Sequence, residues 1–148
     1  MSVASNRSAA GRILIVDDNP LGCVARQSVL AEQGHQVVVA RDPEDAIQKF
    51  SLSTFDLVVT DFKMPAMNGI ELIARLRETK PGVRFILLSG FTDALGLCEE
   101  NTGADAVLQK SNNEVSQLIR SVNRLLGAAK KPPRSQGAGS KAKRRTGD

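Results

Sequence analysis

The feature that most constrains the fold is a short apolar run that ends in a carboxylate. Leu57, Val58 and Val59 are β-prone, the run closes at Asp61, and turn-forming residues follow from Met64 to Gly69. An apolar run this short, bounded by turn residues, is typical of a strand buried on both faces of a parallel sheet. Asp61 is then expected at the carboxyl end of that strand, where open α/β sheets place their functional groups. Alone, an aspartate here is more often a simple turn residue.

Strand and helix patterns alternate along the rest of the chain. Strands are expected at residues 12–16, 36–39, 57–61, 84–88 and 104–108, and helices at 20–34, 43–50, 69–80, 92–100 and 115–126. This alternation predicts an α/β fold, in which a parallel sheet carries helices on both faces. One domain is expected at residues 11–127, with a disordered N-terminus at 1–10 and a disordered, basic, Pro/Gly/Ser-rich tail at 128–148.

Two of the expected helices show clear apolar spacing. In the first helix, the apolar residues at helical spacing are Leu21, Val24, Ala25 and Val29. The last helix has a longer stripe with i, i+3, i+4 and i+7 spacing. Its members are Val115, Leu118, Ile119, Val122, Leu125 and Leu126.

Polar side chains stand where four of the expected strands end. Asp17 and Asp18 follow the first strand, Asp61 ends the third, and Ser89 and Lys110 follow the fourth and fifth. The carboxyl ends of parallel strands share one edge of the sheet, so these groups are expected to converge in one crevice. Each has a simpler explanation alone, as a helix cap, a turn residue or a solvated cation.

Convergent carboxylates repel each other, and a hard divalent cation relieves that repulsion. Asp18 and Asp61 are expected to bind Mg²⁺ directly and Asp17 through water, with the backbone carbonyl of Lys63 as a further oxygen ligand. The same arrangement suits phosphoryl transfer, in which a carboxylate acts as nucleophile and cations stabilise the phosphoryl oxygens. Asp61 is the predicted phosphoacceptor, and Lys110 and Ser89 are predicted to hold the transferred group.

These motifs together resemble the receiver domain of bacterial two-component response regulators, over residues 12 to about 127. The matching segments are Ile-Leu-Ile-Val-Asp-Asp-Asn-Pro at 13–20, Asp-Phe-Lys-Met-Pro-Ala-Met-Asn-Gly at 61–69, Ser-Gly at 89–90 and Gly-Ala-Asp-Ala-Val-Leu-Gln-Lys at 103–110. The resemblance implies a flavodoxin-like (βα)5 fold with strand order 2-1-3-4-5. It also implies Mg²⁺-dependent transfer from a sensor histidine kinase or phosphotransfer protein to Asp61, without enzymatic turnover.

The chain departs from the family pattern at several positions. In the family, an aromatic residue on the fifth strand usually turns inward on activation, and here that position is Val107. Phe91 is therefore a further switch candidate beside Ser89, with a surface or core phenylalanine as the simpler interpretation. Ser111 replaces the usual cis proline after Lys110, so a trans bond is expected there. Lys63 either folds over the acidic crevice or is solvated.

Three functions stay open at this point. The first is a stand-alone receiver, monomeric or weakly dimeric, that signals to a downstream protein through the surface of residues 92–100, 104–108 and 115–126. The second is a pseudo-receiver that binds proteins constitutively, which Val107 and Ser111 favour. The third is a Mg²⁺-dependent phosphatase, which Lys63 argues against because a second acid would be expected there. A flavin-binding protein of the same fold is disfavoured, because the loops lack a Ser/Thr/Gly-rich phosphate cradle.

Charge separates the tail from the body of the chain. The net charge is +4, but residues 128–148 contain seven basic residues and one acid, so the rest of the chain is mildly acidic. The tail either binds an anionic surface such as nucleic acid or lipid, or solubilises the chain, and the second interpretation is favoured. No apolar run reaches membrane-spanning length, which predicts a cytoplasmic protein.

Overall fold

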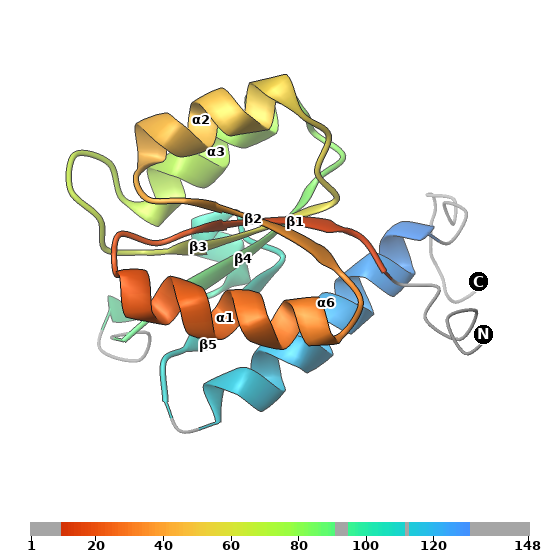
Figure 1. Ribbon diagram of the computed structural model, residues 1–148. Coiled ribbons are helices and arrows are strands. Elements are labelled where there is room, and N and C mark those ends of the chain that lie inside the picture. Colours follow the sequence, from red (N-terminus) through yellow and green to blue (C-terminus); the bar gives the residue numbers. More distant parts are fainter. Residues whose placement is uncertain (1–9, 91–94, 112, 131–148) are drawn as a thin grey trace, which may run out of the picture.

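The computed structural model describes residues 10–90, 95–111 and 113–130 of the chain. Strands and helices alternate within these residues (Figure 1). The strands are β1 (Arg12–Val16), β2 (Gln36–Ala40), β3 (Leu57–Asp61), β4 (Arg84–Ser89) and β5 (Ala106–Gln109). The helices are α1 (Pro20–Glu32), α2 (Pro43–Leu52), α3 (Gly69–Thr79), α5 (Glu99–Thr102) and α6 (Glu114–Lys130).

The five strands form one parallel sheet in the order β2-β1-β3-β4-β5. This confirms the predicted α/β class and the strand order 2-1-3-4-5. Strand β3 lies at the centre, and all five of its residues are buried. In Figure 1, α2 and α3 lie above the sheet and α1 and α6 lie below it. A central strand covered on both faces explains the unbroken apolar run at residues 57–59.

Alternate strand residues supply two separate cores. Val58 and Leu87 point to the side of α2 and α3, where they pack with Phe50 and Leu72. Their neighbours Leu57, Val59, Ile86 and Leu88 point to the opposite side, where they pack with Leu30 of α1 and with the apolar stripe of α6. Because successive side chains of a strand face opposite ways, each strand is fixed from both sides. The carboxyl ends of the strands are therefore held rigidly relative to one another.

Side-chain caps fix where the helices begin. Asn19 accepts a hydrogen bond from the backbone N–H of Leu21 at 3.1 Å, and Pro20 occupies the first turn of α1. At the start of α3, Asn68 and Glu71 form a reciprocal capping box with bonds of 2.9 and 3.0 Å. These two helices start immediately after the loops that follow β1 and β3, so the caps also fix those loops.

The predicted helix at residues 92–100 is wrong at residues 96–98, which interrupt it. The chain leaves helical geometry at Gly96, whose φ of 67° is left-handed, and Cys98 is extended. A new short helix, α5, begins after Cys98. Left-handed geometry is easily adopted by glycine because it has no Cβ, so an internal glycine ended the helical segment here. The first residues of the predicted helix, 92–94, lie outside the described residues.

The buried face of α1 also differs from the one that the apolar spacing predicts. Leu21 and Val24 are 82% and 59% exposed, whereas Cys23, Arg26 and Leu30 are buried. The buried face therefore contains an arginine in place of the expected apolar side chains. Its partners are the carboxylates of Asp17, which follows β1, and Glu114, which begins α6.

The outer boundaries of the predicted domain can be compared only in part. Helix α6 continues to Lys130, three residues beyond the predicted end at 127. Residues 1–9 and 131–148, which contain nearly all of both predicted disordered segments, lie outside the described residues. Among the residues that the structure describes, no helix is both long and apolar enough to span a lipid bilayer.

The close approach of α3 to β3 yields a stability prediction. A Cβ at Gly69 would lie 2.3 Å from the backbone oxygen of Asp61 and 2.6 Å from Leu87 Cδ1. The Gly69→Ala variant is therefore expected to lower the free energy of unfolding by about 1–3 kcal/mol, measured by urea denaturation. Gly82→Ala is the matched control, because a Cβ at that position would have no neighbouring atom within 4 Å. Equal stability of the two variants would contradict the close contact.

Candidate functional site

The carboxyl edge of the sheet gathers the polar residues that end the strands. Asp61 closes β3 between β1 and β4, with Thr60 paired to Val16 and Asp61 paired to Leu88. Ser89, which is 3% exposed, closes β4, and its backbone oxygen accepts the N–H of Lys110 at 2.9 Å. The parallel register therefore brings these ends to one edge, as the sequence pattern predicts.

Three carboxylates meet at this edge. Asp17, Asp18 and Asp61 each offer an oxygen, and these oxygens all lie within 4.8 Å of one another. Asp17 and Asp61 are buried, with 1% and 4% exposure, and Asp18 is exposed. Two of the clustered acids are therefore shielded from solvent, and the third is accessible to it.

Lys110, which follows β5, also reaches the cluster. Its Nζ lies 2.8 Å from Asp61 Oδ1, although the angle between the two groups does not meet hydrogen-bond geometry. Asp61 Oδ1 is therefore buried within an ion pair but has no well-directed hydrogen-bond donor. The described residues contain no cis peptide bond, so the Lys110–Ser111 bond is trans, as expected from Ser111. The trans bond still allows the lysine to reach the acid.

The two buried acids differ in pKa. Burial, together with the neighbouring carboxylate of Asp17, raises the pKa of Asp61 to about 7, although Lys110 opposes this. For Asp17, burial acts to raise the pKa, but hydrogen bonds with Asp61 and Asn19 and the charge of Arg26 outweigh it, and the pKa is lowered. A proton shared by the pair therefore resides on Asp61.

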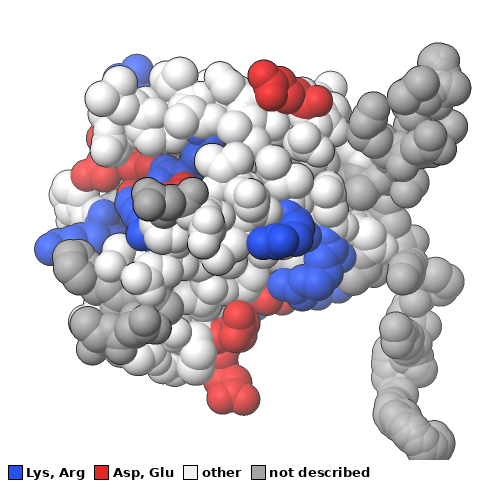
Figure 2. All heavy atoms as spheres, turned by 90° about the horizontal axis from the view of Figure 1, so that it is seen from below, with Lys and Arg blue, Asp and Glu red and all other residues white. Residues whose placement is uncertain are grey.

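Arg26 is a member of this site that the apolar spacing did not predict. Its Nη1 donates to Asp17 Oδ2, and its Nε donates to Glu114 Oε2 of α6 at 2.6 Å. The sequence contained a signal, because Arg26 follows Cys23 by three residues and precedes Leu30 by four, and those two are buried. Seen from below, acidic and basic side chains gather at the left end of the molecule, where the strands of Figure 1 finish (Figure 2).

The loop from β3 to α3 closes beside Asp61. The backbone N–H of Gly69 donates to the oxygen of Phe62 at 2.7 Å, and Thr60 Oγ1 donates to the Asp61 oxygen at 3.0 Å. Ala66 has a φ of 74°, a left-handed value that turns the loop back toward the sheet. Lys63 lies in this loop with its side chain exposed. Its backbone carbonyl as a metal ligand stays a prediction.

The switch candidates are described only in part. Val107 is partly buried, pairs with Leu87, and packs against the core on the side of α2 and α3. Phe91 lies outside the described residues. The proposed switch roles of Ser89, Phe91 and Val107 therefore remain predictions.

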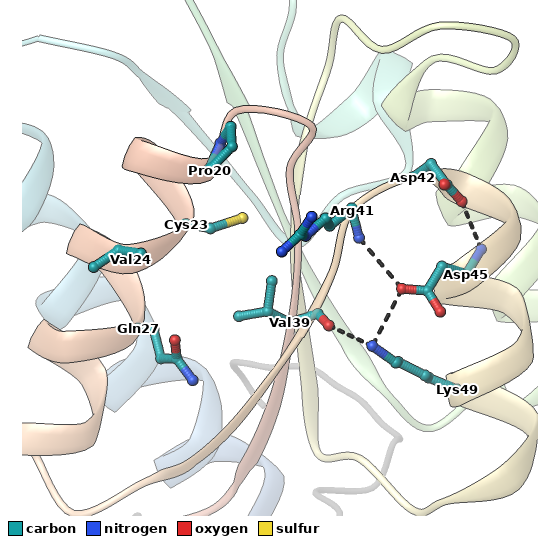
Figure 3. A pocket seen from close by; sticks show the side chains of 9 residues that line it. All are labelled: Pro20, Cys23, Val24, Gln27, Val39, Arg41, Asp42, Asp45 and Lys49. Carbon is teal, nitrogen blue, oxygen red and sulfur yellow. Dashed lines mark hydrogen bonds and ion pairs between the residues drawn. The ribbon is translucent and has the colours of Figure 1, made fainter.

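A separate cavity of about 500 Å³ lies beside the acidic cluster, between α1, β2 and α2 (Figure 3). Its lining includes Cys23, Val39, Arg41 and Lys49, and none of the three clustered acids. Cys23 connects the two regions, because its Sγ also donates to the backbone oxygen of Asp17 at 3.2 Å. Lys49 Nζ donates to the Val39 oxygen at 2.6 Å and forms an ion pair with Asp45 at 3.2 Å, so its ammonium group already has two partners (Figure 3).

The acidic cluster fits a hard divalent cation. Carboxylate oxygens are the ligands that Mg²⁺ prefers, and here three of them lie within the span of one coordination sphere. One of the three acids, Asp61, has a buried oxygen without a hydrogen-bond donor and a raised pKa, which are both relieved by a bound cation.

Comparison with curated relatives points to one family. A gliding motility regulatory protein of Myxococcus xanthus is 35% identical over 120 residues, which cover 77% of this chain and 15% of the relative. The alkaline phosphatase synthesis transcriptional regulatory protein PhoP of Bacillus subtilis is 32% identical over 119 residues, covering 76% of this chain and 48% of the relative. This chain thus spans less than half of either relative, and the prediction of a stand-alone receiver stays a prediction.

Solved structures give the same result. The response regulator TrrA of Thermotoga maritima, solved in complex with Mg²⁺ and BeF, is 32% identical with a TM-score of 0.70, covering 77% of this chain and 97% of that chain. A CheY-like receiver domain protein of Methanospirillum hungatei is 28% identical with a TM-score of 0.72, covering 81% and 96%. The family model of the response regulator receiver domain matches residues 13–123. The chain therefore belongs to the response regulator receiver domain family of two-component signalling.

Proposed function

We propose that this receiver domain accepts a phosphoryl group on Asp61 in a Mg²⁺-dependent reaction and signals by altered protein contacts. The observation that carries the proposal is the environment of Asp61. It is a buried carboxylate at the centre of the sheet edge, with one oxygen lacking a hydrogen-bond donor, a lysine at 2.8 Å and two further acids within 4.8 Å. A structural aspartate would be expected to have its oxygens satisfied by donors.

Each residue has a distinct role in this proposal. A carboxylate oxygen of Asp61 bonds to phosphorus while the phosphorus–nitrogen bond of a donor phosphohistidine breaks, leaving the electron pair on the imidazole. Lys110 balances charge on the transferred group, and Ser89 offers a hydroxyl beside it. Asp17, Asp18, Asp61 and the Lys63 carbonyl would hold Mg²⁺, which supplies charge stabilisation for the phosphoryl oxygens.

The donor in this proposal is a sensor histidine kinase or a phosphotransfer protein. The output is a contact with a downstream protein through β5, α6 and the segment that precedes them. The chain is thus a phosphorylated switch rather than an enzyme that turns over a substrate. The basic tail is assigned a solubilising role and no specific nucleic acid.

Val107 supports the second candidate, a pseudo-receiver. The side chain is already partly buried against the core, and a valine has no ring to exchange between exposed and buried positions. A receiver in which Val107 cannot act as a switch would bind its partner equally well with and without phosphate. Comparing partner binding with and without beryllofluoride would separate the two candidates.

Phosphorylation itself gives the first functional prediction. The full chain, incubated with acetyl phosphate and Mg²⁺, is expected to gain the mass of one phosphoryl group, because Asp61 is the buried nucleophile of the site. Intact-protein mass spectrometry measures the gain, and peptide mapping after borohydride reduction locates it. Asp61→Asn is expected to remove the modification. Asp105→Asn, which replaces the acid directly before β5, is the matched control and is expected to keep it. An unmodified wild-type protein in excess donor and metal would refute the proposal.

The raised pKa of Asp61 gives a second prediction. Burial raises this pKa to about 7, so below that pH the site holds a proton that Mg²⁺ must displace. The affinity for Mg²⁺ is expected to fall as the pH is lowered from about 8 to about 6, measured by titration of backbone amide NMR shifts. Far-ultraviolet circular dichroism at both pH values controls for unfolding. The same affinity at both values would contradict the assignment of the shared proton to Asp61.

A further inference from the structure

Arg26 is buried between two acids from different parts of the fold. Its side chain is 8% exposed, and its guanidinium donates to Asp17 after β1 and to Glu114 at the start of α6. The side chains of Asp17 and Glu114 are 2% and 15% exposed. A fork with two directed N–H groups suits this double contact, which a lysine could not reproduce.

Gly22 provides the space that this arrangement needs. A Cβ at residue 22 would lie 3.0 Å from Arg26 Nη1 and 3.0 Å from Asp17 Oδ2. Glycine within a helix is less favourable than alanine, yet α1 has it in its first turn. The contact between Arg26 and Asp17 lies beside the space that a Cβ of residue 22 would occupy. The local sequence is therefore adapted to hold the guanidinium against the acid.

The contact also changes the charge of the site. When Asp61 is ionised, the three carboxylates carry three negative charges, and Lys110 pairs with the one on Asp61. Arg26 pairs with a second of these charges, on Asp17. A cation entering the cluster must therefore compete with a protein cation for Asp17.

We propose that Arg26 is a built-in counter-cation of the acidic site, which shares Asp17 with an incoming Mg²⁺ and is retained by Glu114 when Asp17 turns to the metal. The inference rests on the proposed metal site and adds a positioning residue to it. It has two consequences. The affinity of the domain for Mg²⁺ is held down, and occupancy of the site is linked to the first turn of α6.

Glu114 explains why the arginine stays near the site. Without a second acceptor, a guanidinium displaced from Asp17 would be buried and unpaired, which is strongly unfavourable. With Glu114 on its Nε at 2.6 Å, one bond persists while the other is exchanged. Metal binding is thus expected to change the contacts of Glu114 although this residue does not contact the metal.

The test measures Mg²⁺ affinity of the full chain and its variants by NMR titration at about pH 8, above the pKa of Asp61. Arg26→Met is expected to bind Mg²⁺ about tenfold more tightly, because Asp17 is no longer shared. Glu114→Gln is expected to bind about two- to threefold more weakly, because Arg26 then rests on Asp17 alone. Arg124→Met, which removes an exposed arginine of α6, is the charge-matched control and is expected to bind as wild type.

The double variant separates a positioning role from a simple charge effect. If Glu114 acts through Arg26, Glu114→Gln has no effect on affinity in the Arg26→Met background. If it acts through its own charge, it weakens binding there too, and the inference fails. The amide shift of residue 114 on Mg²⁺ saturation is a second readout, expected in wild type and absent in Arg26→Met. Should Arg26→Met fail to fold, Glu114→Gln and Arg26→Lys still test the inference. The Arg26→Lys variant is expected to bind Mg²⁺ more tightly than the wild-type protein.

The outcomes for the two proposals differ. Absence of Mg²⁺ binding in wild type and every variant would refute the proposed function. Wild-type binding that is unchanged or weakened in Arg26→Met would refute the counter-cation role and leave the metal site standing.

Discussion

The structure depends on a repulsion that the sheet itself creates. A parallel sheet brings the carboxyl ends of its strands to one edge, and in this chain three of the residues there are aspartates within 4.8 Å of one another. Like charges at that separation, partly out of water, are unfavourable unless protons or cations compensate them. The protein uses both means. Lys110 pairs with Asp61 and Arg26 pairs with Asp17, and burial together with the remaining repulsion from Asp17 raises the pKa of Asp61.

The surrounding fold serves to keep this arrangement rigid. Two cores fix each strand from both faces, and the caps at Asn19 and Asn68 fix the loops that follow β1 and β3. Arg26 then ties the first of these loops to α6 through Glu114. Chemistry at a carboxylate is favoured by such fixed surroundings, because charged groups need not reorganise around the transferred group. The rigidity and the reactivity proposed for Asp61 thus have the same structural origin.

Much of this could be predicted from the sequence, and the failures have physical causes. The strands were predictable because buried parallel strands are short apolar runs, and their shared edge follows from the parallel arrangement. The convergence of Asp17, Asp18, Asp61 and Lys110 follows in turn. The buried face of α1 was not predictable from apolar spacing, since its central member, Arg26, is buried against two carboxylates, of which Glu114 lies 88 residues away in sequence. The helix predicted at residues 92–100 was wrong in part, because the left-handed turn at Gly96 interrupts the helical pattern of the sequence.

The capped and closed loop between β3 and α3 has a consequence for engineering. Its two ends are joined by the 2.7 Å bond from Gly69 to Phe62, and the capping box of Asn68 fixes the start of α3. A peptide grafted into this loop would have to leave both of these contacts in place, close to the residue that ends β3. The turn at Gly82, with open space around it, has neither constraint. A reporter tag or affinity epitope inserted there would leave the opposite edge of the sheet intact.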